Sequence, residues 1–192
     1  MKYINLLLAP VLLLNLSCAR KTENNADIKK LEYHTASGKV FIIVEDVSAG
    51  VDVSILTIRT HYFSEDNHDI ELGRVDPVED IFMSDLDEDG FQEIYLITRS
   101  TSPEEYATIV GFASDRDRRA VKVSFDRALT PGQAAGSPYA GYAGHDQFKL
   151  RDGFIVHSFQ VSSEEKATGQ TRSVRYTLSK EGDQWMLVSV DA

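Results

Sequence analysis

The sequence has a single cysteine, five prolines and fewer basic than acidic residues in its 192 positions. One cysteine excludes a disulfide framework and any metal cluster built from several cysteines. Lysine and arginine number 20 against 30 aspartates and glutamates, which gives a formal net charge of −10. This balance argues against nucleic acid as a partner, because phosphate binding requires a concentrated cationic face. The length and the 42% hydrophobic content indicate one ordinary folded domain.

The motifs of common enzyme classes are also missing. The chain contains no G-x-S-x-G, H-E-x-x-H, P-loop or dinucleotide-binding fingerprint. His145 and Asp146 are adjacent, but neighbouring side chains on an extended chain point apart. We therefore predict that the protein is not an enzyme, with Asp146 in a turn or capping role and His145 at the surface. The alternative, a hydrolase assembled from distant residues, requires a deep pocket that pairs a histidine with Asp or Ser.

The N-terminal segment is the clearest targeting signal. A basic start is followed by the Leu-rich run Ile4–Leu16, whose thirteen residues span about 20 Å as a helix. This is too short for a hydrocarbon core of about 30 Å and is typical of a secretory signal. The run ends in Ser17-Cys18 and resembles a bacterial lipoprotein signal, in which cleavage follows Ser17 and Cys18 takes the lipid. A plain secretory signal with an incidental thiol is the alternative.

Cleavage between Ser17 and Cys18 would divide the chain into a signal peptide and a mature protein. Residues 1–17 are the predicted signal peptide, and the polar residues 18–30 form a predicted tether to a single β domain over 31–192. Removal of Lys2 leaves 19 basic against 30 acidic residues, a net charge of −11. We expect an exported lipoprotein that faces the periplasm from the outer membrane or lies on the cell surface.

The body of the chain consists of short β-rich runs separated by turn residues. No segment shows a 3.6-residue apolar stripe over three turns, so we predict an all-β fold, an antiparallel sandwich or barrel of about 8–10 strands. The Gly- and Ala-rich stretch 130–144 is predicted as a long loop or a short helix. The predicted strands are 39–44, 51–58, 81–83, 93–98, 106–112, 120–125, 147–150, 154–161, 172–178 and 184–190.

An acidic loop between two predicted strands is the sharpest local signal. Residues 85–93 fit the pattern D-x-D-x-D-G-x-x-E. Three carboxylates at alternate positions converge on one hard cation when the chain curls, and Gly90 permits the turn. We predict a structural Ca²⁺ held by Asp85, Asp87, Asp89 and Glu93. A solvated acidic hairpin without a cation is the alternative.

The same region carries a family resemblance. Residues 78–100 combine a strand, the acidic loop and a second apolar strand that ends in Arg99-Ser100, and Tyr106 follows. This arrangement resembles the centre of the periplasmic inhibitors of invertebrate-type lysozyme. The resemblance covers an inhibitor-like part over 31–128, and residues 129–192 are a C-terminal β extension outside it.

The resemblance implies an exported all-β protein that presents a surface loop to the active-site cleft of a lysozyme. The implied partner-contact residues are Arg99, Ser100, Ser102 and Tyr106. In this family a Ser and a Tyr stand three residues apart around glycine, whereas here Pro103 lies three residues before Tyr106, and Glu104 and Glu105 take the place of glycine. The acidity of the chain favours association with a basic lysozyme, at a rate that falls as salt rises.

Two functions therefore stay open. The first is an envelope-anchored lipoprotein that resembles the lysozyme inhibitors and binds a lysozyme through this loop. The second is a Ca²⁺-stabilised β-rich lipoprotein that binds or assembles another envelope component and has no inhibitory activity. Tyr139 and Tyr142 would then form a recognition patch, although they would equally pin their loop to the core.

Overall fold

The computed structural model describes residues 20–21, 26–125, 137–163 and 166–190. Within these residues the chain forms thirteen strands and no helix, so the predicted all-β class is confirmed and the expected strand number is too low. The strands are β1 (Arg20–Lys21), β2 (Ile28–His34), β3 (Val40–Asp46), β4 (Ser54–His61), β5 (Asp69–Val75), β6 (Val78–Ser84), β7 (Glu93–Arg99), β8 (Ala107–Ser114), β9 (Ala120–Phe125), β10 (Gln147–Arg151), β11 (Phe154–Ser163), β12 (Lys166–Glu181) and β13 (Gln184–Ser189).

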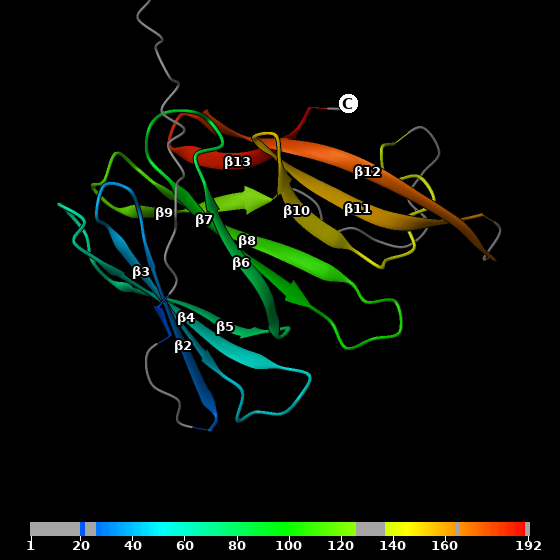
Figure 1. The fold of residues 1–192 in the computed structure, drawn as a ribbon, viewed down its shortest axis with the longest axis horizontal. Coiled ribbons are helices and arrows are strands. Elements are labelled where there is room, and N and C mark those ends of the chain that lie inside the picture. Colours follow the sequence, from blue (N-terminus) through cyan, green and yellow to red (C-terminus); the bar gives the residue numbers. More distant parts are fainter. Residues whose placement is uncertain (1–19, 22–25, 126–136, 164–165, 191–192) are drawn as a thin grey trace, which may run out of the picture.

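The strands form two sheets that pack as a barrel-like sandwich (Figure 1). The smaller sheet has the order β1-β2-β3-β4-β5 and is antiparallel throughout. The larger sheet has the order β10-β11-β12-β13-β9-β8-β7-β6 and is strongly curved. Its edge strands are β6 and β10.

One pairing corrects the expectation of an antiparallel fold. Strands β9 and β13 run parallel, with Trp185 opposite Val123 and Leu187 opposite Phe125. This pairing joins the C-terminal strands β10–β13 to β6–β9, so the predicted C-terminal extension shares a sheet with the part of the chain that precedes it. The partners lie about 60 residues apart, and no local pattern in the sequence signals such a contact.

Two predictions about the smaller sheet also differ from the structure. Strand β2 begins at Ile28, whereas the tether was expected to extend to residue 30, and β5 was not expected at all. Charged residues dilute the apolar pattern of both strands. The pairing of β4 with β5 shifts register between Leu56 and Thr57, with the extra residue in β5 beside Gly73.

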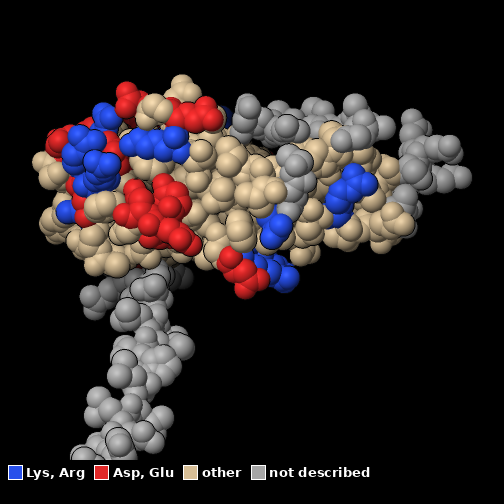
Figure 2. Space-filling model, turned by 90° about the horizontal axis from the view of Figure 1, so that it is seen from above, with Lys and Arg blue, Asp and Glu red and all other residues tan. Residues whose placement is uncertain are grey.

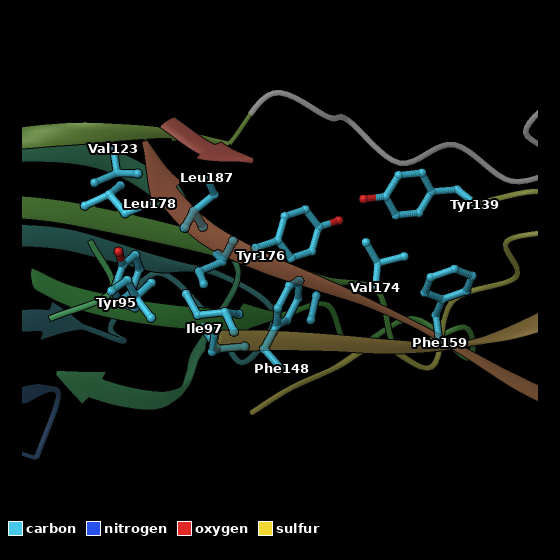
Figure 3. Packing of buried hydrophobic residues seen from close by; sticks show 14 of the residues in the cluster. Tyr95, Ile97, Val123, Tyr139, Phe148, Phe159, Val174, Tyr176, Leu178 and Leu187 are labelled. Carbon is cyan, nitrogen blue, oxygen red and sulfur yellow. The ribbon is translucent and has the colours of Figure 1, made fainter. Parts of the chain in front are cut away.

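The hydrophobic core has two parts, and β7 contributes to both. Ile94 and Leu96 face the smaller sheet, whereas Tyr95 and Ile97 face the interior of the curved sheet (Figure 3). Six of the seven β7 residues are buried as a result. This strand is therefore a fixed central element, and the loops at its two ends are the regions that the sequence singled out.

The described part of the Gly- and Ala-rich stretch is a turn, and the rest of it lies outside the described residues. Tyr139 and Tyr142 are both buried, and both rings pack on Phe159. The two tyrosines thus pin the loop to the core. They do not form the exposed recognition patch that was the alternative.

Candidate functional site

The acidic loop connects β6 to β7 and gathers its carboxylates as predicted. One oxygen from each of the four side chains Asp85, Asp87, Asp89 and Glu93 lies within 4.8 Å of the others. The backbone at Glu88 and Gly90 has positive φ angles of 57° and 89°, which curls the chain tightly. The Asp85 and Asp89 carboxylates also accept backbone N–H groups of the loop, from Gly90 at 3.0 Å and Phe91 at 2.9 Å.

Glu93 is the buried member of this group. It is the first residue of β7, is only 1% exposed, and its Oε2 accepts the Leu86 N–H at 2.8 Å. Burial raises the pKa of Glu93 to about 9, and the three aspartates add to the increase. Burial and the charge of Asp89 also raise the pKa of Asp87. A bound cation would reverse these effects because it favours the charged form of each carboxyl group.

An unsatisfied oxygen completes the picture of a metal site. Asp85 Oδ1 is buried and has no hydrogen-bond partner among the described residues. A buried acceptor without a partner is costly, and a cation within the loop would satisfy it. The four residues can therefore hold a metal ion. Their ligand atoms are all oxygens, the type that hard cations prefer.

The loop is tied to two distant parts of the chain. The Leu86 carbonyl accepts the Thr177 hydroxyl of β12 at 2.9 Å, and the Leu86 side chain is buried in the larger core. The Gln92 side chain accepts the Ala36 N–H from the β2–β3 turn at 2.7 Å. Both sheets are therefore linked through the residues that curl around the carboxylates.

A second buried carboxylate, Asp146, lies just before β10. It is 0% exposed, and its Oδ2 accepts the Tyr142 hydroxyl at 2.6 Å and the Ala107 N–H at 2.8 Å. Its Oδ1 lies 2.7 Å from Nε2 of His157, which is also 0% exposed. The sequence does not reveal this pair, because His157 lies eleven residues away on another strand. A turn or capping role was predicted for Asp146, and the observed role is capping, because its carboxylate accepts the N–H of Ala107 at the start of β8.

The contacts of Asp146 and His157 stabilise the 139–146 loop. Both Asp146 oxygens are engaged, and the His157 ring stacks on Phe148 with centroids 4.3 Å apart. Burial and the hydrogen bond to Asp146 raise the pKa of Tyr142, so its hydroxyl stays a donor. His157 Nδ1 has no partner in the described residues. The pair therefore holds the 139–146 loop against β8 and β11, and it presents no exposed face to a substrate.

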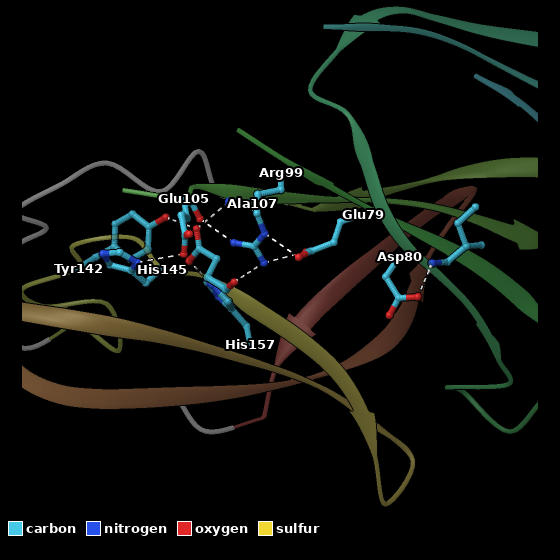
Figure 4. Close-up of polar contacts among 10 residues, drawn as sticks. Glu79, Asp80, Arg99, Glu105, Ala107, Tyr142, His145 and His157 are labelled. Carbon is cyan, nitrogen blue, oxygen red and sulfur yellow. Dashed lines mark hydrogen bonds and ion pairs between the residues drawn. The ribbon is translucent and has the colours of Figure 1, made fainter. Parts of the chain in front are cut away.

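The residues implied as partner contacts gather around the β7–β8 loop. The Arg99 guanidinium pairs with Glu79 through two bonds of 2.7 and 2.8 Å, and it donates to the carbonyls of Glu105 and Asp146 (Figure 4). Tyr106 is half-buried and packs on Tyr142. These two side chains therefore brace the loop from inside.

The remainder of the loop is a tight turn at the surface. Ser100 Oγ accepts the Ser102 N–H at 3.0 Å, and Ser102 Oγ is buried without a hydrogen-bond partner in the described residues. The exposed tip consists of Thr101, Pro103, Glu104 and Glu105. The His145 N–H donates to the Glu104 carbonyl at 2.6 Å, which fixes the turn to the 139–146 loop. His145 is itself partly exposed, as expected.

Two cavities flank this loop. One of about 370 Å³ is lined by Arg99, Ser100 and Ser102 and by Val51, which is 86% exposed. A larger cavity of about 710 Å³ lies on the other side of the Glu79–Arg99 ion pair and reaches β10. The three implied contact residues other than Tyr106 thus share a surface recess.

Charged side chains are unevenly spread over the molecule. On the face shown in Figure 2, acidic side chains gather in a patch with lysines and arginines beside them.

In the described part of the chain, no helix is long and apolar enough to cross a membrane. The predicted signal peptide and Cys18 lie outside the described residues.

Models of protein families, curated proteins and solved structures were all compared with this chain, and none of them matches it. The class of this protein therefore follows from its fold and its acidic loop alone. The chain is an all-β protein with two packed sheets and a cluster of four carboxylates that can hold a metal ion.

Proposed function

We propose that the protein is an exported, lipid-anchored binding protein of the cell envelope, and that Ca²⁺ in the acidic loop stabilises its fold. The observation that carries the proposal is the gathering of four carboxylate oxygens within 4.8 Å around a buried Glu93. The signal sequence that ends at Cys18 supports export and lipidation. Another protein of the envelope is the proposed partner.

The donor set favours Ca²⁺ over other common cations. It contains carboxylates and no histidine or cysteine, which argues against Zn²⁺. The ligands lie on a curled loop that adapts its geometry, whereas Mg²⁺ requires a near-ideal octahedron and keeps several waters. The ion would be structural, because the described residues place no nucleophile or histidine among the four ligands.

Thermal unfolding with Ca²⁺, with Mg²⁺ and with a chelator tests this role. At a hundredfold excess over its dissociation constant, Ca²⁺ stabilises the fold by about 2.7 kcal/mol, or roughly 5–10 °C in Tm. Asp87→Asn should abolish the increase. The matched control is Glu88→Gln, since Glu88 is exposed and is not in the ligand cluster. Equal Tm values with Ca²⁺ and with the chelator would remove the metal from the proposal.

A second candidate function is binding to an invertebrate-type lysozyme through the β7–β8 loop. It is favoured by the surface recess that Arg99, Ser100 and Ser102 share beside the exposed tip. The net charge of −11 after cleavage would attract a basic enzyme.

A lysis assay with purified lysozyme separates the two candidates. We expect inhibition that weakens as salt rises and that is reduced in Glu104→Lys at the loop tip. Glu181→Lys is the matched control, because it makes the same charge change at another exposed site. Lysis at an unchanged rate with excess protein would eliminate the inhibitor and leave the envelope-binding function.

A further inference from the structure

The two edge strands of the larger sheet face each other across a cavity. The cavity of about 710 Å³ is lined by Glu79 and Asp80 of β6 and by Gln147, Phe148 and Lys149 of β10. Among the described residues no strand pairing joins β6 to β10, so the curved sheet stops short of closing there. We call this gap between β6 and β10 the seam.

One end of the seam is held shut. Arg99 donates to the Asp146 carbonyl at 2.6 Å, and the Ala107 N–H donates to the Asp146 carboxylate. Arg99 also forms an ion pair with Glu79 of β6 (Figure 4). Its guanidinium therefore connects β6 to Asp146, the residue before β10, at one point. Beyond that point the described residues show no hydrogen bond from β6 to β10. The seam is therefore an open recess with a fixed end.

The two edges differ in their readiness to accept another strand. The pairing of β6 with β7 shifts register between Val78 and Asp80, and the Asp80 carboxylate accepts the Ile81 N–H at 2.8 Å. A bulge and charged residues are the usual protection of an edge against pairing. In contrast, β10 pairs with β11 at five consecutive positions without a shift. No described strand pairs with the other side of β10, which is thus a regular row of backbone donors and acceptors.

Each of the two walls of the cavity carries a charged side chain that is not engaged in an ion pair among the described residues. Asp80 on β6 and Lys149 on β10 line the same cavity, and neither forms an ion pair with a described residue. Glu79 is already engaged by Arg99, and Glu105 lies 3.2 Å from His145. Ile97 and Phe159 also line the cavity, beside polar residues of β11 and β12 such as Thr171. A strand seated here would meet Lys149 on β10 and Asp80 on the opposite wall. The lining as a whole holds four acidic side chains against two basic ones, Arg99 and Lys149, so it favours a basic strand whose cationic side chains lie on the Asp80 side.

We propose that an extended, basic segment of a partner protein adds to β10 within the seam, with a lysine or arginine directed at Asp80. Main-chain hydrogen bonds to β10 supply affinity, and the charge at Asp80 selects the sequence. The proposal rests on the proposed function as a binding protein, of which it names the partner class. It is independent of the Ca²⁺ loop at the other end of β7.

A peptide-binding experiment on the intact protein tests the seam. The probe is an eight-residue peptide that alternates lysine with valine, compared with a copy N-methylated at every second residue and with a glutamate–valine copy. Calorimetric titration should show saturable binding of the lysine–valine peptide alone. Asp80→Asn should weaken it about fivefold, because an exposed pair contributes up to about 1 kcal/mol. The control Asp183→Asn removes an exposed charge elsewhere and should leave binding unchanged.

Each contrary result removes a defined part of the proposal. Equal binding of the N-methylated peptide would overturn strand addition, and equal binding of the glutamate peptide would overturn the charge selection. No binding of any peptide would overturn the seam as a site but would leave the Ca²⁺ response of the fold intact. Sedimentation that shows a dimer blocked by Lys149→Pro would overturn the partner segment and identify a second copy as the occupant.

Discussion

Two buried carboxylates at opposite ends of β7 have opposite surroundings. Glu93 at the start of the strand lies among three further carboxylates, and its pKa is raised to about 9. Asp146, near the end of the strand, accepts hydrogen bonds from Tyr142 and Ala107 and pairs with His157. The same chemical group is thus surrounded by hydrogen-bond donors at one end and by like charges at the other. The end with crowded like charges is the one that a cation would stabilise.

The largest effect is expected where the carboxylate is fully satisfied by the protein. Asp146→Ala should lower the free energy of unfolding by about 3 kcal/mol or more, because it leaves the buried Tyr142 hydroxyl, His157 ring and Ala107 N–H without their acceptor. Urea denaturation measures the loss. Asp183→Ala in an exposed turn is the control and should change little. A loss below about 1 kcal/mol would show that Asp146 does not support the loop.

The two ends also differ in what the sequence can predict. The four ligands of the acidic loop lie within nine residues, so their spacing was sufficient to predict that they gather. The partners of Asp146 come from β8, the 139–146 loop and β11, and only the folded chain brings them together. The Arg99 contacts were missed for the same reason. Arg99 was selected as a partner contact, yet it braces the two loops internally.

In the fold, too, local sequence patterns predicted individual strands but not the pairing of strands that are distant in the sequence. Apolar runs with turn residues between them predicted most of the strands and the all-β class. Strand β5 was missed because Gly73 and three charged residues break its alternation. The parallel pair of β9 and β13 depends on how the sheet curves, which no local pattern records.

A smaller effect is expected where the acidic loop meets β12. Thr177→Val removes the hydroxyl that donates to the Leu86 carbonyl and should cost about 1 kcal/mol of stability. It should also weaken Ca²⁺ binding, because Leu86 lies between two ligands. The control is Thr171→Val, at an exposed position on the same strand. Equal loss of stability in both variants, measured by denaturation, would argue that the hydroxyl does not anchor the loop.

The smallest effect concerns a third carboxylate, Asp115, which pairs with Arg118 at 2.7 Å and Lys180 at 3.3 Å. Burial opposes its ionisation, but the hydrogen bond and charge of Lys180 and the nearby arginines outweigh burial and lower the pKa of Asp115. Its contribution is therefore present above the unfolded-state pKa, about 3.9, and is lost as pH falls through the lower folded value.

Unfolding of the parent and of Asp115→Asn at pH 6 and pH 3 isolates this contribution. We expect the two proteins to differ by about 1 kcal/mol or less at pH 6, because the charged partners of Asp115 are largely exposed. The difference should be smaller at pH 3, which lies below the unfolded-state pKa. A difference that persists unchanged at pH 3 would show that the pair is held by packing and not by charge.

The most direct test of the central claim is a calorimetric titration of the chelator-treated protein with Ca²⁺. The arrangement of Asp85, Asp87, Asp89 and Glu93 predicts one ion per chain, and Glu93→Gln should weaken binding at least tenfold by removing the buried ligand. Absence of saturable binding at millimolar Ca²⁺, or unchanged affinity in Glu93→Gln, would contradict the account.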